Sequence, residues 1–168
     1  KYTPIEKVAR ELTTHQLSFN IVSRDYLKSA TIEENRYFIN KIGFKVLIFP
    51  YGECIPADIL KQLSTMLEKN IKIIFLEALP KTILGDYDEK EWNFIRQNSI
   101  VIPMHELNQY LYEYKSVQFD KEVNDLVVGE YIREDKFIYM FFNENFSKEI
   151  DVNMIFKEKG HIYQYDAF

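Results

Sequence analysis

Cysteine is almost absent from this sequence: of 168 residues, only Cys54 carries a thiol. A single cysteine excludes an internal disulfide framework, because a disulfide needs two partners. The sequence therefore predicts a domain held together by its hydrophobic core, and it leaves the redox compartment open.

Glycine is scarce as well. The glycines are isolated from one another in the sequence: Gly43, Gly52, Gly85, Gly129 and Gly160. Loops that cradle phosphate groups need clustered glycines, as in the dinucleotide-binding fingerprint and the Walker loop. The sequence therefore argues against a nucleotide-dependent function, and we predict no cofactor.

The sequence has no excess of positive charge. Lysine and arginine number 21 against 26 aspartates and glutamates, for a formal net charge of −5. Because a phosphate backbone favours a basic protein surface, nucleic acid is not a predicted partner. No apolar run approaches the roughly 20 residues of a membrane-spanning helix, so a membrane is not a predicted partner either.

Patterns of metal ligands are also lacking. His15, His105 and His161 lie far apart in the sequence, and Cys54 has no second thiol near it, so we predict no metal site. The acidic run at 86–91 (DYDEKE) lacks the spacing and the glycine of a calcium-binding EF-hand loop. Acidic side chains favour the first turn of a helix, so this run predicts a helix start instead.

The sequence does contain the material for a core, since 46% of its residues are hydrophobic. The central stretch is 45–56 (KVLIFPYGECIP), whose run VLIF is apolar throughout. Pro50 and Gly52 end this run, and a helical pattern begins at Pro56. An apolar run that is ended by turn residues and followed by a helix is typical of a buried strand in a parallel sheet.

The same alternation recurs along the first two thirds of the chain. Strands are predicted at 19–22, 45–49, 71–76 and 99–102, with helices between them and a last helix over 106–114. Alternating strands and helices predict a flavodoxin-like α/β domain, in which helices flank a parallel sheet centred on 45–49. A first helix is predicted to begin at Thr3 or Pro4, because Ile5, Val8 and Leu12 fall on one helical face. No strand precedes this helix, so we expect an unpaired sheet edge beside 19–22.

Two short extended patterns, 31–33 and 36–40, interrupt this alternation, and Glu34 and Asn35 between them predict a hairpin turn. After about Ser116 the pattern changes to strands alone. These strands are predicted at 125–133, 137–143, 149–156 and 161–165. We therefore assign residues 1–115 to the α/β domain and 116–168 to an antiparallel sheet that forms part of a β-sandwich. Without a covering sheet, its apolar side chains would face water.

Several segments carry a family resemblance: ELTTHQLSFNIVSRDYL, LIFPYGECIP, IIFLEALP, YMFFNEN and IYQYDAF. In their order, they resemble the amidotransferase-like domain that follows the catalytic barrel in some bacterial glycoside hydrolases. That domain is similar to the trimerisation domain of β-galactosidases. The last two segments resemble the start of the β-sandwich domain that comes next.

The resemblance implies a non-catalytic scaffold or oligomerisation module of a hydrolase of carbohydrate metabolism. In that family, two carboxylates of a preceding barrel perform the sugar chemistry, so we expect no catalytic residue in this chain. The implied partners are the other domains of the parent hydrolase and, in a homo-oligomer, further copies of the chain. The implied source is bacterial, and we favour a cytoplasmic over a secreted location.

A ligand would bind at the carboxyl edge of the predicted sheet, where open parallel sheets place their ligands. The polar residues Ser23, Arg24 and Asp25 follow the first predicted strand. The residues that we select as the candidate ligand-binding set follow the other three strands: Tyr51, Glu53, Glu77 and His105.

A cysteine hydrolase is a further alternative. Cys54 would be the nucleophile, His105 the base, and Glu77 or Glu106 the group that orients the base. Class I amidotransferases hold their cysteine in a Gly-x-Cys-x-Gly turn, whereas this chain has Pro56 in place of the second glycine. We therefore favour a buried cysteine without a catalytic role.

Aromatic side chains in the β-segment leave one more alternative open. Tyr139, Phe141 and Phe142 are close in the sequence and would form a surface on which sugar rings stack. Alternating aromatic residues in a strand are more often part of a core, so we favour that role.

Overall fold

The computed structural model describes residues 3–134 and 136–165, and their contacts divide the chain into two compact units. The first unit comprises the residues up to Val8 and Asn20–Leu107. The second comprises Ala9–Phe19 and the residues from Asn108 onward. The boundary therefore falls inside helix α1 (Ile5–Thr14) and at the start of helix α5 (Leu107–Leu111).

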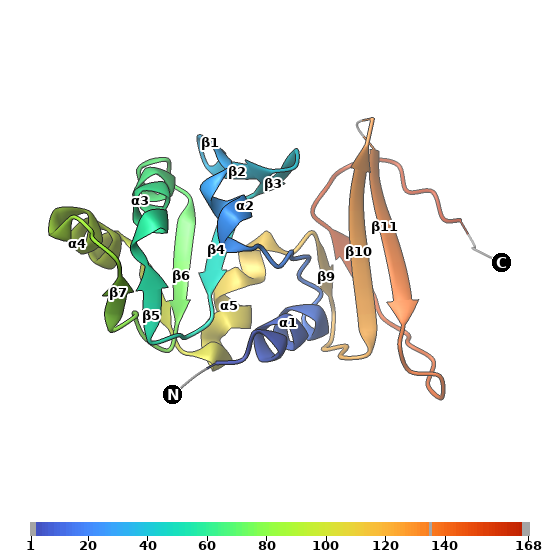
Figure 1. The fold of residues 1–168 in the computed structure, drawn as a ribbon. Helices are drawn as coiled ribbons and strands as arrows, with labels where there is room; N and C mark the ends of the chain where they lie inside the picture. The colour runs from blue at the N-terminus through green and yellow to red at the C-terminus, as the bar shows by residue number, and fades with distance from the viewer. Residues whose placement is uncertain (1–2, 135, 166–168) are drawn as a thin grey trace. The chain divides into compact units, whose positions relative to one another are not determined.

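The first unit contains the predicted parallel sheet (Figure 1). Its strands, in the order β4–β6–β8, are Val46–Phe49, Lys72–Leu76 and Ile100–Ile102. Val46 lies opposite Lys72, and Ile74 lies opposite Ile100, with both pairs of strands parallel. The predicted fold class, a parallel sheet flanked by helices and followed by an antiparallel β-segment, is confirmed.

The centre of this sheet is β6, so the prediction of 45–49 as the central strand is wrong. All four side chains from Ile73 to Leu76 are buried, which shows that both faces of β6 are covered. The predicted strand at 19–22 is absent, and Ile21 in it is 65% exposed. A strand needs a neighbour to accept its backbone hydrogen bonds, and this segment forms no ladder. Within the described residues, β4 and β8 are instead the two edge strands of this sheet.

Helices connect the parallel strands. The 3-10 turn η1 (Ala57–Ile59) and α3 (Leu60–Glu68) join β4 to β6, and α4 (Glu89–Asn98) joins β6 to β8. Asp88 caps α4, because its carboxylate accepts the N–H of Lys90 at 2.8 Å, so the predicted helix start is confirmed. Because the strand order never reverses, right-handed crossovers put α3 and α4 on one face, where they pack together.

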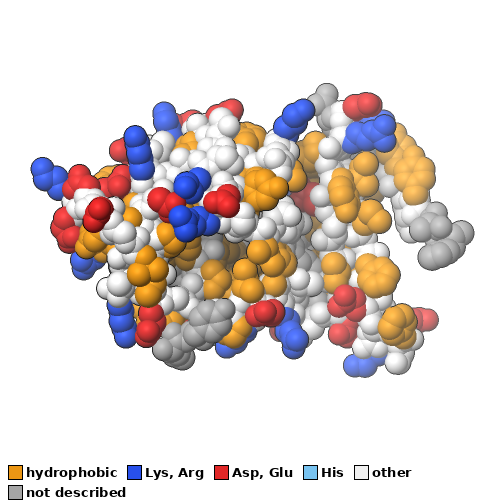
Figure 2. Space-filling model, viewed as in Figure 1, with side chains coloured by type: hydrophobic (Ala, Val, Ile, Leu, Met, Phe, Trp, Pro, Cys, Tyr) orange, Lys and Arg blue, Asp and Glu red, His pale blue; other side chains and the backbone are white. Residues whose placement is uncertain are grey.

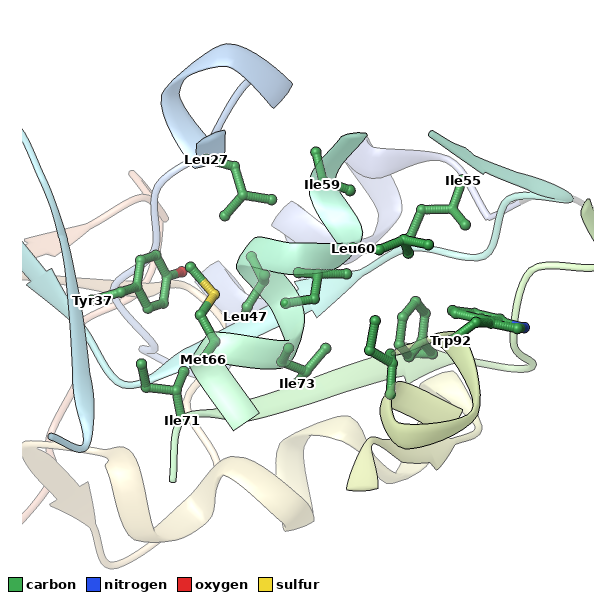
Figure 3. Packing of buried hydrophobic residues seen from close by; sticks show 13 residues of the cluster. Leu27, Tyr37, Leu47, Ile55, Ile59, Leu60, Met66, Ile71, Ile73 and Trp92 are labelled. Atoms are coloured by element: carbon green, nitrogen blue, oxygen red, sulfur yellow. The ribbon is translucent and has the colours of Figure 1, made fainter. Parts of the chain in front are cut away.

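The core of the first unit lies between these helices and β6 (Figure 3). Leu60, Leu63 and Met66 recur at helical spacing along α3 and are fully buried. They pack in one cluster with Ile73 and Phe75 of β6. Complete burial of each such side chain contributes about 1.5–3 kcal/mol. This packing holds β6 in place, and with it the carboxyl edge of the sheet, where a ligand site was predicted.

A separate antiparallel sheet confirms the predicted hairpin. Its strands are β1 (Thr31–Glu33), β2 (Arg36–Ile39) and β3 (Ile42–Phe44), the last of which the sequence did not predict. Asn40 and Lys41 join β2 to β3 with φ values of 49° and 69°. Positive φ at both positions matches the type I′ turn that closes short hairpins.

Further short elements of the first unit were not predicted. Helix α2 spans Arg24–Lys28, directly after the segment that was expected to be a strand. β5 (Cys54–Pro56) pairs in parallel with β7 (Thr82–Leu84). At the boundary between the units, η2 (Met104–Glu106) leads into α5, and η3 (Tyr112–Tyr114) follows in the second unit, so the helix predicted over 106–114 is present in three pieces.

The second unit contains two antiparallel ladders rather than the single four-stranded sheet that was predicted. In one, β10 (Leu126–Arg133) pairs with β11 (Lys136–Asn143). In the other, β9 (Val117–Phe119) pairs with β12 (Met154–Phe156), the only part of 149–156 that is a strand. The described residues at 161–165 form no strand. The ladders face each other through Tyr139 and Phe156, whose ring centroids are 5.1 Å apart.

None of the helices formed by residues 3–134 and 136–165 combines the length and the apolar character that crossing a membrane requires.

Candidate functional site

The carboxyl edge of the parallel sheet carries the four residues that the sequence selected as ligand-binding. Tyr51 is buried, and its carbonyl oxygen accepts the N–H of Thr3 at 3.1 Å. Glu53 is exposed, and its carbonyl oxygen accepts the N–H groups of Lys81 and Thr82 at 2.9 and 3.0 Å. The Glu53 carboxylate also lies 3.7 Å from the ammonium group of Lys81. Both residues thus hold neighbouring chain segments in place.

Glu77 has the most specific structural role of the four. It follows β6 directly with a φ of 68°, and its own N–H donates to the carbonyl of Ile102 at 2.8 Å. Its carboxylate accepts the N–H of Met104, the first residue of η2, at 3.0 Å. Pro103 precedes that residue and is the formal N-cap, but no side-chain cap bond comes from it. Glu77 therefore supplies in space the cap that the local sequence lacks.

His105 lies on the surface of η2. Its side chain is 82% exposed, and its Nε2 atom lies 3.8 Å from the Glu106 carboxylate. Within the described residues, no recorded polar contact joins two members of the set Tyr51, Glu53, Glu77 and His105. All four residues follow strands of the parallel sheet, but each contacts a different neighbour.

Cys54 is exposed, at the start of β5, so the expectation of a buried cysteine is wrong. β5 lies outside the three-stranded sheet and is too short to cover its side chain on both faces. A cysteine nucleophile needs a base within hydrogen-bonding reach. The recorded partner of the His105 imidazole is Glu106, the next residue along the chain. The cysteine hydrolase alternative requires an accessible thiol and a nearby base, and the exposure of Cys54 meets only the first of these requirements.

The aromatic residues of β11 do not share one surface. Tyr139 and Phe141 point to the face that packs on Phe156, with centroid distances of 5.1 and 6.3 Å. Phe142 points to the opposite face and is 60% exposed. The alternation along the strand thus separates the three rings that were considered as a sugar-stacking surface.

Among the side chains that the structure describes, no group of three or more His, Cys, Asp or Glu residues is placed to hold a metal ion.

The second unit contains a polar pocket that the sequence did not reveal. Its volume is about 300 Å³, and it is built from three separate segments at 14–16, 108–115 and 117–123. The polar and charged side chains that line it include His15, Asn108, Lys115, Gln118, Lys121 and Glu122. These residues form no motif in the sequence. They come together only because the turn after α1 is hydrogen-bonded to the segment before β10.

Gln16 makes that junction. Its side-chain amide donates to the carbonyl oxygens of Thr14, Val123 and Leu126 at 2.6, 2.7 and 2.9 Å. The φ of Gln16 is 55°, which turns the chain sharply after α1. One side chain thereby ties together segments more than 100 residues apart and shapes one wall of the pocket.

The electrostatics of the pocket centre on Lys115. Its ammonium lies 5.5 Å from the ring centroid of Tyr112. Burial lowers the pKa of the Lys115 amine, and the nearby negative charge of Glu122 acts in the opposite direction. On the other wall, His15 Nδ1 lies 2.9 Å from the carbonyl oxygen of Glu11. A carbonyl only accepts, so Nδ1 carries the proton and Nε2 is the acceptor of the neutral ring.

Comparison with protein-family models, with curated proteins and with solved structures found no match for this chain.

Proposed function

We propose that this chain is a non-catalytic scaffold or oligomerisation module of a bacterial glycoside hydrolase, and that it associates through one face of the β10–β11 ribbon. The observation that carries the proposal is the uncovered apolar face of that ribbon. The resemblance of several segments to the domain behind the catalytic barrel of such hydrolases supports it. The structural roles of Glu53 and Glu77 support the non-catalytic part.

The register of the ribbon defines this face. Residues that lie directly opposite each other in the ladder share a face, so Tyr131 lies beside Ile138, and Val127 beside Phe142. We call the following five side chains the ribbon face: Val127, Tyr131, Ile138, Met140 and Phe142. Met140 and Phe142 are each 60% exposed. Figure 2 shows hydrophobic side chains at the surface where Figure 1 places β10 and β11.

Association through the ribbon face would bury several apolar side chains of each partner. Full burial of one large apolar side chain contributes about 1.5–3 kcal/mol, whereas association costs about 4–15 kcal/mol of lost freedom. Several side chains from each partner are therefore needed, and two ribbon faces supply them. Within the described residues, β10 and β11 pair only with each other, so each also has an unpaired edge of eight residues.

Sedimentation velocity at micromolar concentration tests the proposal. We expect the wild-type chain to sediment as a species heavier than the 20.2 kDa monomer. The double variant Met140→Lys, Phe142→Lys should sediment as the monomer, because two ammonium groups would have to be desolvated at the contact. Since both side chains are largely exposed, the variant should retain its fold, which circular dichroism checks.

The matched control is Ile155→Lys. Ile155 is 65% exposed but lies on β12, outside the ribbon face, so this variant should associate like the wild type. A wild-type chain that stays monomeric, or a double variant that associates as strongly as the wild type, would contradict the proposal. The isolated chain should also leave nitrophenyl glycosides intact, because we assign the carboxylate pair of glycoside hydrolysis to another domain.

A small-ligand or carbohydrate-binding module is the second candidate function. One observation favours it, the polar pocket of the second unit, which differs from the sheet edge selected from the sequence. The third candidate, a degenerate cysteine hydrolase, is favoured only by the exposure of Cys54.

A further inference from the structure

The geometry points to a ligand for the pocket of the second unit: we propose that it binds a small hydroxylated carboxylate, of the size of a single sugar acid, with Lys115 pairing with the carboxylate. The site is independent of the proposed association, because none of its lining residues belongs to the ribbon face. A volume of about 300 Å³ lies at the lower end for ligand pockets, which favours a molecule of one ring.

The first step of the argument is the state of Lys115. A half-buried ammonium is costly unless an anion or several acceptors compensate its lost hydration. In the described part of the chain, the recorded contact of this ammonium is the ring of Tyr112 at 5.5 Å. A cation–π contact compensates only part of the cost. An anion in the pocket would complete the compensation, and a carboxylate is the anion that an ammonium most often pairs with in proteins.

The second step concerns the groups around that charge. The acceptors are Nε2 of His15, which is left by the bond from Nδ1 to Glu11, and the carboxylate of Glu122. Gln118 and Asn108 add amide groups that both donate and accept. Acceptors and amides beside a cation suit a molecule that has hydroxyl groups as well as a carboxylate. A plain inorganic anion would leave the acceptors unused.

The pattern of charge also sets a limit on the ligand. Glu122 is close enough to Lys115 to favour its protonated form, yet no ion pair between them is recorded among the described residues. The carboxylate of Glu122 therefore competes weakly for the ammonium and repels a second negative charge. Lys121 also lines the pocket, so two ammonium groups and one carboxylate surround it, and their net charge of about +1 suits a ligand with a single carboxylate.

Nuclear magnetic resonance titration of the full chain with three probes tests the proposal. Glucuronate should shift backbone amides of residues 14–16 and 112–123 in a saturable way at millimolar concentration. Glucose, which has the same hydroxylated ring without the carboxylate, and sulfate, which lacks the hydroxyl groups, should bind at least about ten-fold more weakly. Lys115→Met should weaken glucuronate binding by about ten-fold or more, because it removes a charge-assisted hydrogen bond. The exposed Lys159, which does not line the pocket, gives the matched control Lys159→Met, with unchanged binding.

A second variant keeps the test decisive if Lys115→Met fails to fold. Glu122 is exposed, so Glu122→Gln should fold. Its amide oxygen still accepts a hydrogen bond from a ligand hydroxyl group, whereas loss of the competing negative charge should tighten glucuronate binding. The proposal is overturned if glucuronate shifts no amide in these segments, or if glucose or sulfate binds as tightly as glucuronate. It is also overturned if Glu122→Gln leaves the affinity unchanged or lowers it.

Discussion

Replacement of Glu77 separates a structural role from a ligand-binding role at the carboxyl edge of the sheet. Two effects act at this position. The carboxylate caps η2 by accepting the N–H of Met104 at 3.0 Å, and a cap of this kind contributes about 0.5–2 kcal/mol. The φ of 68° places a non-glycine residue in the left-handed region, at a cost of about 1–2 kcal/mol.

The two effects predict different stabilities for two variants. Glu77→Ala loses the cap and keeps the backbone cost, so it should reduce the free energy of unfolding by about 1 kcal/mol. Glu77→Gly also loses the cap, but relief of the left-handed conformation offsets that loss. It should therefore be close to the wild type and more stable than Glu77→Ala by roughly 1 kcal/mol.

Urea denaturation measures this difference. Trp92 is the only tryptophan of the chain, and it is buried in the first unit, so its fluorescence reports the unfolding of that unit. The midpoints should shift while the slopes stay equal. Glu106→Ala is the control, because Glu106 is exposed and contacts His105 only at 3.8 Å. If Glu77→Ala matches the wild type, Glu77 is not a cap. If Glu77→Gly is less stable than Glu77→Ala, the left-handed backbone at position 77 does not have the cost assigned to it.

Three further predictions concern single groups. Hydrogen bonds from Arg24 and Lys28, at 3.1 and 2.8 Å, lower the pKa of the Asp58 carboxyl group in the folded protein. The ionised carboxylate therefore stabilises the fold at a pH above its pKa in the unfolded chain. This stabilisation is lost as the pH falls through the lower pKa of the folded protein. Asp58→Asn should therefore be less stable than the wild type at neutral pH and should approach it below about pH 4 in urea titrations; a difference independent of pH would argue against this pairing. Burial raises the pKa of Tyr37 to about 12, so the wild type should lose stability as the pH rises from about 10 towards that value. Tyr37→Phe should not show this loss. Alkaline denaturation curves that coincide for the two proteins would contradict this account of Tyr37. Cys54 should react with an alkylating reagent at the rate of an unactivated, accessible thiol, and a much faster reaction would instead favour the cysteine hydrolase.

The sequence was sufficient to predict the helices and strands that are determined by interactions within a few residues. The apolar runs at β4, β6 and β8 each carry their own signal, and turn residues end each run. Asp88 and the acids after it mark the start of α4 because the cap and the helix dipole act within one turn.

Patterns that depend on a distant partner could not be predicted from the sequence. The segment at 19–22 is as apolar as the short strands, but no neighbour pairs with it, and Ser23 caps α2 directly afterwards. β9 has only three residues and exists because β12, more than 30 residues later, pairs with it. The order of strands placed β6 rather than β4 at the centre, and nothing in the run VLIF encodes that order.

The candidate site shows the same division. The sequence correctly placed Glu77 after a strand of the parallel sheet, because that position follows from the end of an apolar run. Its role as a cap depends on a left-handed backbone and on contact with Met104, which lies 27 positions later. The pocket around Lys115 was missed because His15 reaches it from the other end of the chain, with Gln16 as the link.

Hydrogen exchange as a function of protein concentration tests most directly whether the ribbon face is an association surface. Peptides from 126–133 and 136–143 would be followed by mass spectrometry at low and high micromolar concentration, with peptides from β6 as the internal reference. We predict that the ribbon becomes more protected as concentration rises, because its edges and its apolar face are covered in the associated state, while β6 is unchanged. Ribbon exchange that is equally fast at both concentrations, in a chain whose mass remains that of the monomer, would contradict the account.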